Sequence, residues 1–479
     1  MYKTLKKTFP KDKDYPERAF RLQCLQRVLR GTIYDQLKHA FHDEKGGDGK
    51  YIPLRERRPC VRSNLCRIVV SDSVSLLFSE GHFPAVEMGD EHAKAAMAKM
   101  LREARINEVM IDTAMRGSVG SAAIHFQVLG ERVFLKVLDT DMLTPTWKPK
   151  APDTLETVTE KYKVDGKALK AIGYDIADDD LAAQHWFMRE WSETAETWFM
   201  PWKVADDEGH VPVIDAEQTI AHDLGFVPIV WIKNLPGGDD VDGRPTFPDE
   251  AIDAQIEIDY QLSQGGRGLK YSSDPTLLIK EPASGADGEP IVRGAANALV
   301  VGADGDAKLL EINGTAVTAM LDYVKHLREV GLENMHGNRV SAEKISAAQS
   351  GRAMELMAQA LVWLADQLRI SYGEYALVEI VSMIIRASNK ISLKLRNGTA
   401  VAPFDLTRDA SLRWPDWFAT TAQDRLNTAS TLVKLSDAGL MSRQTAINVL
   451  AADYDIEDTA EEKRLADAEL AAGNEDASV

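Results

Sequence analysis

The chain has 479 residues, enough for roughly two to four folding units, and its 44% hydrophobic and 27% charged content is that of an ordinary globular protein. Its formal net charge of -18 excludes a broadly basic protein of the kind that wraps nucleic acid. The same charge fits simple solubility, or a channel through which DNA slides without sticking. Cys24, Cys60 and Cys66 form no CxxC pair, so we expect reduced thiols and neither a disulfide framework nor a zinc knuckle.

The first quarter of the chain is predicted to be helical. Apolar residues recur at helical spacing over residues 17–42, 60–78 and 91–115. Strand-like sequence follows, with a hairpin signal at Gly130-Glu131 and three tryptophans in the third run. The β-prone runs cover residues 122–129, 132–138, 185–200 and 226–233. We therefore expect residues 1–247 to be an α+β unit in which helices precede an antiparallel sheet.

Two amphipathic helices are predicted on either side of a turn-rich insert in the middle of the chain. The first covers about 248–271, with Thr246 as a plausible N-cap, and is expected to fade at Gly265-Gly266-Arg267-Gly268. The insert, residues 274–314, contains two short strand-like runs, at 275–280 and 298–301. The second helix covers 315–334, with Thr315 as its cap.

A long helix is predicted next, over residues 350–387, after a break at His336-Gly-Asn-Arg339. Apolar side chains nearly encircle this helix, so it must be packed on all sides, by its own chain or by copies of it. Its most apolar stretch, 376–385, is too short to span a membrane and is interrupted by Glu379.

The C-terminal region is expected to be mainly helical, with Ser442 as an N-cap. Strands are predicted at 391–395 and 411–414, and helices at 424–438 and 442–450. From Asp453 onward the sequence is acidic and poor in aromatic residues, which predicts an exposed, partly disordered tail.

Motifs of catalysis and of cofactor binding are missing from the sequence. It contains no P-loop, HExxH or GxSxG pattern, and its ten histidines are scattered. The glycine run at 265–268 follows a helix rather than a strand, which excludes a dinucleotide or NTP loop there. Carboxylate runs at Asp239-Asp240 and Asp178-Asp180 lie in turn-like sequence. We expect no catalytic residue, metal or cofactor; a nucleotide-dependent enzyme and a nuclease are the weaker alternatives.

Basic residues gather in the middle of the chain. On one subunit they are compatible with an ordinary mixed-charge surface, but repeated around an axis each would become a belt of charge facing phosphate. They are Arg267, Lys270, Lys280, Arg293, Lys308, Lys325, Arg328, Arg339 and Lys344.

Several stretches, together with the order of the predicted elements, resemble the portal proteins of tailed bacteriophages. The stretches are Val227–Lys233 with Asn234-Leu-Pro-Gly, the helix with Ile252, Ile256 and Asp259, Asp274-Pro-Thr-Leu-Leu-Ile, Ser350-Gly-Arg-Ala353, and Gly439-Leu-Met-Ser-Arg-Gln-Thr-Ala446. The resemblance extends over about residues 15–465, and the order of elements is its stronger part. The helix opening at Phe247-Pro-Asp-Glu and the short acidic stretch after residue 453 depart from the pattern.

The resemblance implies an α+β, mainly helical portal fold. Its parts would be an N-terminal wing (1–247), stem helices (248–273 and 315–334), a small β clip (274–314), a tunnel loop (335–349), a long wing or tunnel helix (350–390), a C-terminal wing or crown (391–452) and a flexible acidic tail (453–479).

The resemblance also implies a ring, typically of twelve subunits, at one capsid vertex of a virion whose proteins are made in the host cytoplasm. Its partners would be the large terminase, the major capsid protein, the head-tail connector and, without sequence preference, double-stranded DNA. No membrane is involved. A non-catalytic virion scaffold or adaptor without a DNA channel is the alternative.

Three groups of residues are expected to act in such a ring. The channel wall would be largely acidic, so that the few basic contacts grip DNA weakly. The channel loop would use His336, Asn338, Arg339 and Lys344; the stem would present Arg267, Lys270, Lys325 and Arg328; and the clip would bind partners through Lys280, Arg293 and Lys308.

Overall fold

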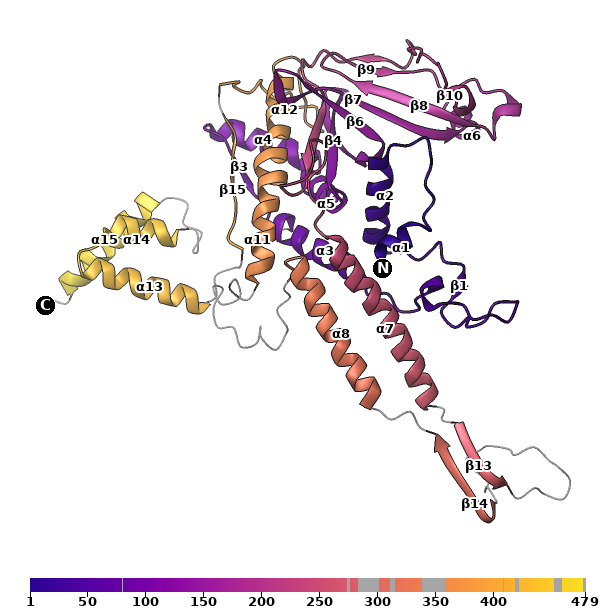
Figure 1. The fold of residues 1–479 in the computed structure, drawn as a ribbon. Helices are drawn as coiled ribbons and strands as arrows, with labels where there is room; N and C mark the ends of the chain where they lie inside the picture. Colours follow the sequence, from indigo (N-terminus) through magenta and orange to yellow (C-terminus); the bar gives the residue numbers. More distant parts are fainter. Residues whose placement is uncertain are drawn as a thin grey trace.

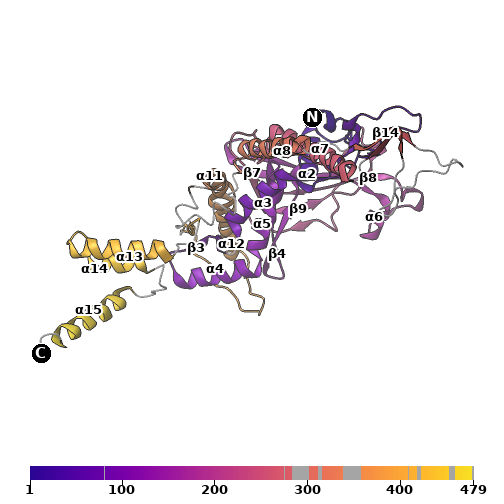
Figure 2. The same ribbon diagram turned by 90° about the horizontal axis from the view of Figure 1, so that it is seen from below.

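The computed structural model describes residues 1–79, 81–273, 276–282, 301–310, 315–337, 356, 358–407, 409–417, 422–451 and 459–476. The chain is mixed α+β and mainly helical, as expected. A body of helices and sheets carries a projecting pair of helices, α7 and α8, with a small hairpin at their far end (Figure 1). Both views show the C-terminal helices α13–α15 standing away from the body (Figures 1 and 2).

The N-terminal helices are shorter than the sequence predicts, because the backbone turns left-handed at two places. Gly31 (φ 73°) ends the helix predicted for 17–42, where the Gly31 and Thr32 N–H groups bond back to Val28 and Arg27. Arg105 (φ 55°) divides the helix predicted for 91–115. The helices are α1 (Tyr2–Lys6), α2 (Glu17–Arg30), α3 (Leu65–Phe78), α4 (Glu91–Glu103) and α5 (Ile106–Gly117).

A three-stranded antiparallel sheet lies at the centre of the body. Its order is β12-β4-β5, with β4 at Ser121–Leu129, β5 at Arg132–Leu138 and β12 at Ile229–Lys233. Gly130 (φ 55°) and Glu131 (φ 62°) both have positive φ angles, which is the geometry of a type I′ turn. The hairpin predicted from Gly130-Glu131 is therefore confirmed.

A second, larger sheet forms the outer layer, in the order β11-β9-β8-β7-β6, with β10 also paired to β8. The strand pair predicted for 185–200 is confirmed as β8 and β9. Strands β6 and β7 were not predicted, since Val158 is the only fully buried position along the polar β7. The elements are β6 (Leu143–Lys148), β7 (Ala151–Asp165), α6 (Gly166–Ala171), β8 (Gln184–Trp191), β9 (Ala195–Trp198), β10 (Trp202–Lys203) and β11 (Ile220–Ala221).

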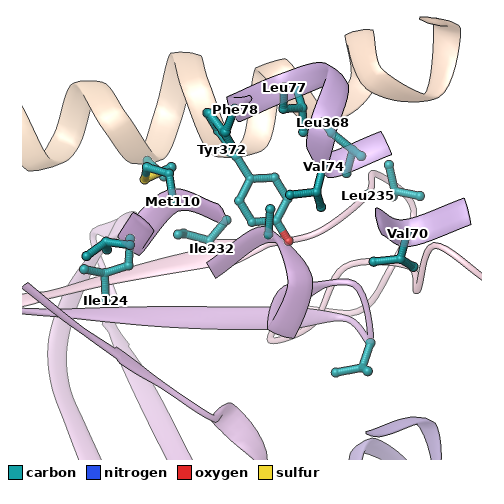
Figure 3. Close-up of a cluster of buried hydrophobic side chains, with 14 of the residues drawn as sticks. Val70, Val74, Leu77, Phe78, Met110, Ile124, Ile232, Leu235, Leu368 and Tyr372 are labelled. Carbon is teal, nitrogen blue, oxygen red and sulfur yellow. The ribbon is translucent and has the colours of Figure 1, made fainter. Parts of the chain in front are cut away.

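One long helical rod runs through the core. It consists of α11 (Gln359–Leu368), a π-helical segment (Arg369–Leu377) and α12 (Val378–Ser388). Figure 3 shows Tyr372, from the π-helical segment, among side chains of α3, α5, β4 and β12. The Tyr372 hydroxyl donates to Asn234 Oδ1 at 2.9 Å, and Gly117 leaves the space it needs, since a Cβ there would lie 2.1 Å from it. Residues 350–355 and 357 of the predicted helix lie outside the described residues.

The far side of this rod is not covered by its own chain. Trp363, Ile370 and Tyr375 are 56%, 59% and 44% exposed, so packing on all sides, as predicted from the sequence, is reached within one subunit on one side only. The next segment packs on the π-helical turn: Arg369 stacks on Trp414 and Trp417. The π-helical segment thereby ties the body to the chain that leads into α13.

The C-terminal region differs from prediction in one place. The strand predicted at 391–395 is wrong, because only an isolated bridge joins Lys394 to Ala400. The tail, expected to be exposed and partly disordered, contains a helix, and Arg443 pairs with Asp467 on it at 2.9 Å. Ser442 is confirmed as an N-cap, since its hydroxyl accepts from the Thr445 N–H. The elements are β3 (Ala85–Glu87), which pairs with β15 (Ser411–Arg413), and α13 (Ala422–Asp437), α14 (Arg443–Leu450) and α15 (Thr459–Asp476).

His125 joins the two sheets and makes the body acid-sensitive. Its ring packs edge-on against Trp191 at 5.0 Å, with Glu196 Oε2 3.9 Å away and already engaged by Arg189. Burial, followed by the positive charges of Arg189 and Lys136, lowers the pKa of His125 to about 3. The imidazole is therefore neutral in the folded state, and its contact with Glu196 is not an ion pair.

The unfolded state then binds one more proton than the folded state below about pH 6.5, so stability falls as pH falls. We expect His125 to contribute a loss of about 2 kcal/mol between pH 6.5 and pH 5. Urea unfolding at these two pH values should show a smaller loss for His125→Gln than for the parent. His92→Gln, at an exposed position, serves as control, and an equal pH dependence of all three proteins would refute the assignment.

Candidate functional site: the stem and its hairpin

The stem consists of α7 (Asp249–Ser273) and α8 (Thr315–Asn334), and buried polar contacts fix its root in the body. Asp259 is fully buried and accepts from the Ser63 N–H at 2.6 Å and from the Tyr34 hydroxyl at 2.9 Å. Gln255 accepts from the Cys66 N–H at 2.9 Å. Burial raises the pKa of the Asp259 carboxyl. These contacts hold the first helix of the stem against the start of α3.

One glycine lies at the contact between the two stem helices. A Cβ on Gly265 would lie 2.0 Å from the methyl group at the end of the Met320 side chain, while a Cβ on Gly331 would lie 2.8 Å from Leu65 of α3. The expectation that α7 fades at 265–268 is wrong: the helix continues to Ser273, and Gly265 serves close packing rather than flexibility. Thr246 is not its N-cap, because its hydroxyl accepts from Asn234 while the Pro248 carbonyl accepts from Ala251 and Ile252.

The second stem helix ends where the sequence predicts a break. The Gly337 N–H bonds to the Leu332 carbonyl at 2.8 Å, and the His336 N–H to that of Glu333 at 3.2 Å, which is the Schellman arrangement. His336 occupies its left-handed position (φ 54°). Gly337 lies against Val69, where a Cβ would lie 2.4 Å away. The chain leaving α8 is therefore fixed to α3 up to residue 337.

A two-stranded antiparallel hairpin, the distal hairpin, forms the far end of the stem. It consists of β13 (Thr276–Pro282) and β14 (Val301–Leu310), so the second strand overlaps the predicted run at 298–301 only at Val301 and lies further along the chain than predicted. Lys280, which is exposed, lies opposite Asp306, and Lys308 lies opposite Leu278. The register shifts between Lys280 and Pro282.

The predicted stem cations differ in their surroundings. Arg267 forms an ion pair with Glu44 of the same chain. Lys325 lies 3.6 Å from Asp322 and is 78% exposed, and Arg328 is exposed on the same helix. Lys270 lies on α7, and the structure does not describe its side chain. Arg267 is thus partly neutralised within the subunit, while Lys325 and Arg328 face outward.

Of the residues predicted for the channel loop, the structure describes only His336. His336 is exposed at the body end of the stem, where α8 ends. Asn338, Arg339 and Lys344, and Arg293 of the clip, lie outside the described residues. The roles of these residues therefore stay predictions.

The described residues hold little that could bind a cofactor. No three His, Cys, Asp or Glu side chains among them are grouped so as to hold a metal ion. A cavity of about 450 Å³ lies beside α2, and most of its charged groups pair with each other: Arg21 with Asp239 and Asp242, and Lys6 with Asp249, while Arg244 also lines it. No helix in the described ranges has both the length and the apolar character of a membrane span.

One charged region was missed by reasoning from the net charge of the whole chain. Residues 1–70 contain 17 Lys and Arg against 8 Asp and Glu, a formal charge of +9 within a chain of -18. Counting charge in windows of the sequence would have found it. Part of this region, residues 38–58, lies along α7, where Tyr260 donates to the Arg57 carbonyl at 2.9 Å.

Comparison with known proteins identifies the family. No curated protein sequence matches the chain. Among solved structures, the neck of an empty GTA particle, computed with C6 symmetry, is 12% identical; the match covers 80% of this chain and 90% of that one, with a TM-score of 0.41. A likeness at that level carries no argument about function. The family described as "Phage portal protein, SPP1 Gp6-like" matches residues 9–475, nearly the whole chain, and the chain therefore belongs to this family of phage portal proteins.

Proposed function

We propose that the chain forms a closed ring, expected to have twelve subunits, at one vertex of a phage capsid. The genome would enter the capsid through this ring during packaging and leave through it on ejection. The observation that carries the proposal is the projecting stem with its terminal hairpin (Figure 1), in a member of the portal family. Such a projection, repeated around an axis, makes a tube with a rim of hairpins at one end.

Exposed apolar residues support assembly into a ring. The outward surface of α8 exposes Leu321, Tyr323 and Val330, which are 43%, 46% and 37% exposed, and the long helical rod exposes Trp363 and Ile370. A single subunit gains nothing from presenting this surface to water. Closed cyclic symmetry buries such surfaces on every copy without open-ended growth.

We propose that the ring holds DNA weakly and without sequence preference. Arg339 and Lys344, in the tunnel loop at 335–349, would reach phosphate, assisted by His336 and Asn338. Lys325 and Arg328 on α8 would add a belt of charge from the stem. The affinity for DNA falls as salt rises, with a slope of log affinity against log salt that is proportional to the number of phosphates contacted. Few contacts per subunit therefore give weak binding, and weak binding permits the duplex to pass through the ring.

The distal hairpin, with Lys280, Arg293 and Lys308, is proposed to bind the large terminase during packaging and the head-tail connector afterwards. A projecting module can bind successive partners without disturbing the packed body. The outer sheet of the body is proposed to face the major capsid protein. Subunits made in the host cytoplasm would become part of the virion, and we infer no catalytic role.

The test is a replacement of residues 276–310 by a short linker. Negative-stain images should show rings for the parent and, in part, for the variant, while pull-down of the large terminase should be lost in the variant. Removal of α15 (Thr459–Asp476), which projects elsewhere, is the matched control and should leave terminase binding unchanged. If terminase still binds the variant without the hairpin, the role proposed for the hairpin is refuted.

The same images distinguish the ring from the alternative function, a virion scaffold or adaptor without a DNA channel. Monomers across a wide range of concentration, in solution and in particles, would favour it and would overturn the ring. Arg339→Ala/Lys344→Ala then tests the channel: packaging and retention of DNA should change while the ring still forms. Unchanged packaging in this variant would refute the role given to the tunnel loop.

A further inference from the structure

Part of the positive charge of the N-terminal region lies in a closed loop beside the stem, the basic loop (residues 38–58), which contains six Lys and Arg against four Asp and Glu. Strands β1 (His39–Ala40) and β2 (Arg57–Arg58) pair in parallel at its two ends, with His39 opposite Arg57. A bridge between Lys45 and Tyr51 and a bond from the Ile52 N–H to the Glu44 carbonyl (2.9 Å) close its far end.

Arg57 carries a positive charge inside this loop that no carboxylate neutralises. Its side chain is 1% exposed, and it donates to the Ile52 carbonyl at 2.9 and 2.7 Å and to the Phe41 carbonyl at 3.4 Å. Within the described residues, no acidic oxygen lies within 4 Å of its guanidinium. Carbonyl groups satisfy the N–H donors but leave the net charge, so an anion near the loop would stabilise it.

The surface of the basic loop adds more uncompensated charge. Among the described residues, exposed cations on and next to the loop have no carboxylate within 4 Å of their charged nitrogens. They are Lys38, Lys45, Arg55, Arg58 and Arg67. Most of the loop's carboxylates are engaged: Glu44 with Arg267, Asp48 with Lys50, and Asp43 with the Ala40 N–H. The loop therefore presents these cations outward, next to the exposed carboxylates of Asp43, Asp48 and Glu56.

The loop is fixed to the stem rather than hanging from it. The Tyr260 hydroxyl, on α7, donates to the Arg57 carbonyl, and Arg267, also on α7, pairs with Glu44. A ring of subunits would therefore repeat the basic loop at the level where the stem leaves the body (Figure 1). Such a repeat concentrates positive potential in one belt of an otherwise acidic assembly.

We propose that the basic loop binds the phosphate backbone of double-stranded DNA, without sequence preference. The inference rests on the proposed function, and it assigns DNA contact to a surface separate from the tunnel loop and α8. A protein partner with acidic residues fits less well, because protein interfaces have apolar or aromatic centres. Within the loop, Tyr51 is the one large hydrophobic side chain that is well exposed, at 67%. Clustered Lys and Arg with little apolar surface is the pattern of a phosphate-contacting face.

The test compares two triple variants of the full chain that remove the same charge. Lys45→Ala/Arg55→Ala/Arg58→Ala removes cations of the loop, and Lys99→Ala/Lys150→Ala/Lys167→Ala removes exposed cations elsewhere. Binding to a linear duplex is measured by fluorescence anisotropy at several salt concentrations. The slope of log affinity against log salt should become shallower by about 0.9 for each phosphate that the protein no longer neutralises, so by up to about 2.7 in the loop variant. The control variant should keep the parent slope.

Equal slopes for the parent and both variants, or no DNA binding by the parent, would overturn the inference. The inference would also be overturned by a loop variant that keeps DNA binding but no longer binds terminase, capsid protein or connector. That result would show that the loop binds an acidic protein instead of DNA. If the triple variant does not fold, Lys45→Gln, at an exposed position, is measured in its place, with an expected change of about 0.9. Negative-stain images of each protein test the ring separately, so rings with equal slopes refute this inference alone.

Discussion

Replacing Tyr372 by alanine is expected to destabilise the body by roughly 3–5 kcal/mol, the cost of removing a large buried aromatic side chain. Tyr372 has no exposed surface and packs against α3, α5 and β12 from the π-helical segment (Figure 3). Its hydroxyl also satisfies Asn234 Oδ1, and Asn234 in turn donates to the Arg244 carbonyl and to Thr246. The substitution therefore creates a cavity in the core and leaves Asn234 Oδ1, a buried acceptor, without its donor.

Urea unfolding followed by tryptophan fluorescence measures this effect. Tyr372→Phe keeps the ring and removes only the hydroxyl, so its cost should be about 1–2 kcal/mol. Tyr375→Ala, three residues along the same rod at a side chain 44% exposed, should cost less than about 1 kcal/mol. Equal midpoints for the alanine variants at positions 372 and 375 would contradict the central place of Tyr372 in the core.

Asp259→Ala is expected to loosen the stem from the body at a cost of roughly 3 kcal/mol, because one buried donor and one part-buried donor lose their acceptor together. The buried Tyr34 hydroxyl and the part-buried Ser63 N–H both bond to this carboxylate. Asp259→Asn should be intermediate, since one amide oxygen replaces two carboxylate oxygens.

Glu257→Ala is the matched control for Asp259. Glu257 is an acidic residue on the same helix, and it accepts a hydrogen bond from Gln261 on the next turn of that helix rather than from the body. Unfolding midpoints should be close to the parent for this variant, and limited proteolysis near residues 58–64 should increase only in Asp259→Ala. A stem that stays protease-resistant in Asp259→Ala would show that α7 is held by apolar packing alone.

Local chemistry explains which elements could be predicted from the sequence. Gly130-Glu131 fixes its hairpin through two positive φ angles, and α8 carries its apolar spacing from Thr315 to its end, so both were predicted with accurate bounds. Arg105 gives no such signal, because a left-handed arginine is set by the packing of α4 and α5 around it. Strand β7 was missed since its neighbours supply its hydrogen bonds while its side chains stay polar.

The candidate site was predicted in outline and missed in detail for a related reason. The local spacing of apolar residues predicts two helices on either side of an insert, and the structure has α7, the hairpin and α8 in this order. The glycines at 265–268 were taken as a flexible end because Met320, which packs against Gly265, is far along the sequence. The ion pair between Arg267 and Glu44 could not be predicted from the sequence either, since it joins residues more than two hundred positions apart.

The root of the stem also sets the order in which the chain completes its fold. Tyr34 and Asp259 are 225 residues apart and Cys66 and Gln255 are 189 apart, so Tyr34, which follows α2, and Cys66 of α3 gain these contacts only after α7 has been synthesised. Contacts of such long range form late and slow folding. Since α8 begins at Thr315, its exposed apolar surface emerges from the ribosome only after the residues that close the root. The residues that close the root of the stem are therefore all synthesised before the surface that can recruit another copy.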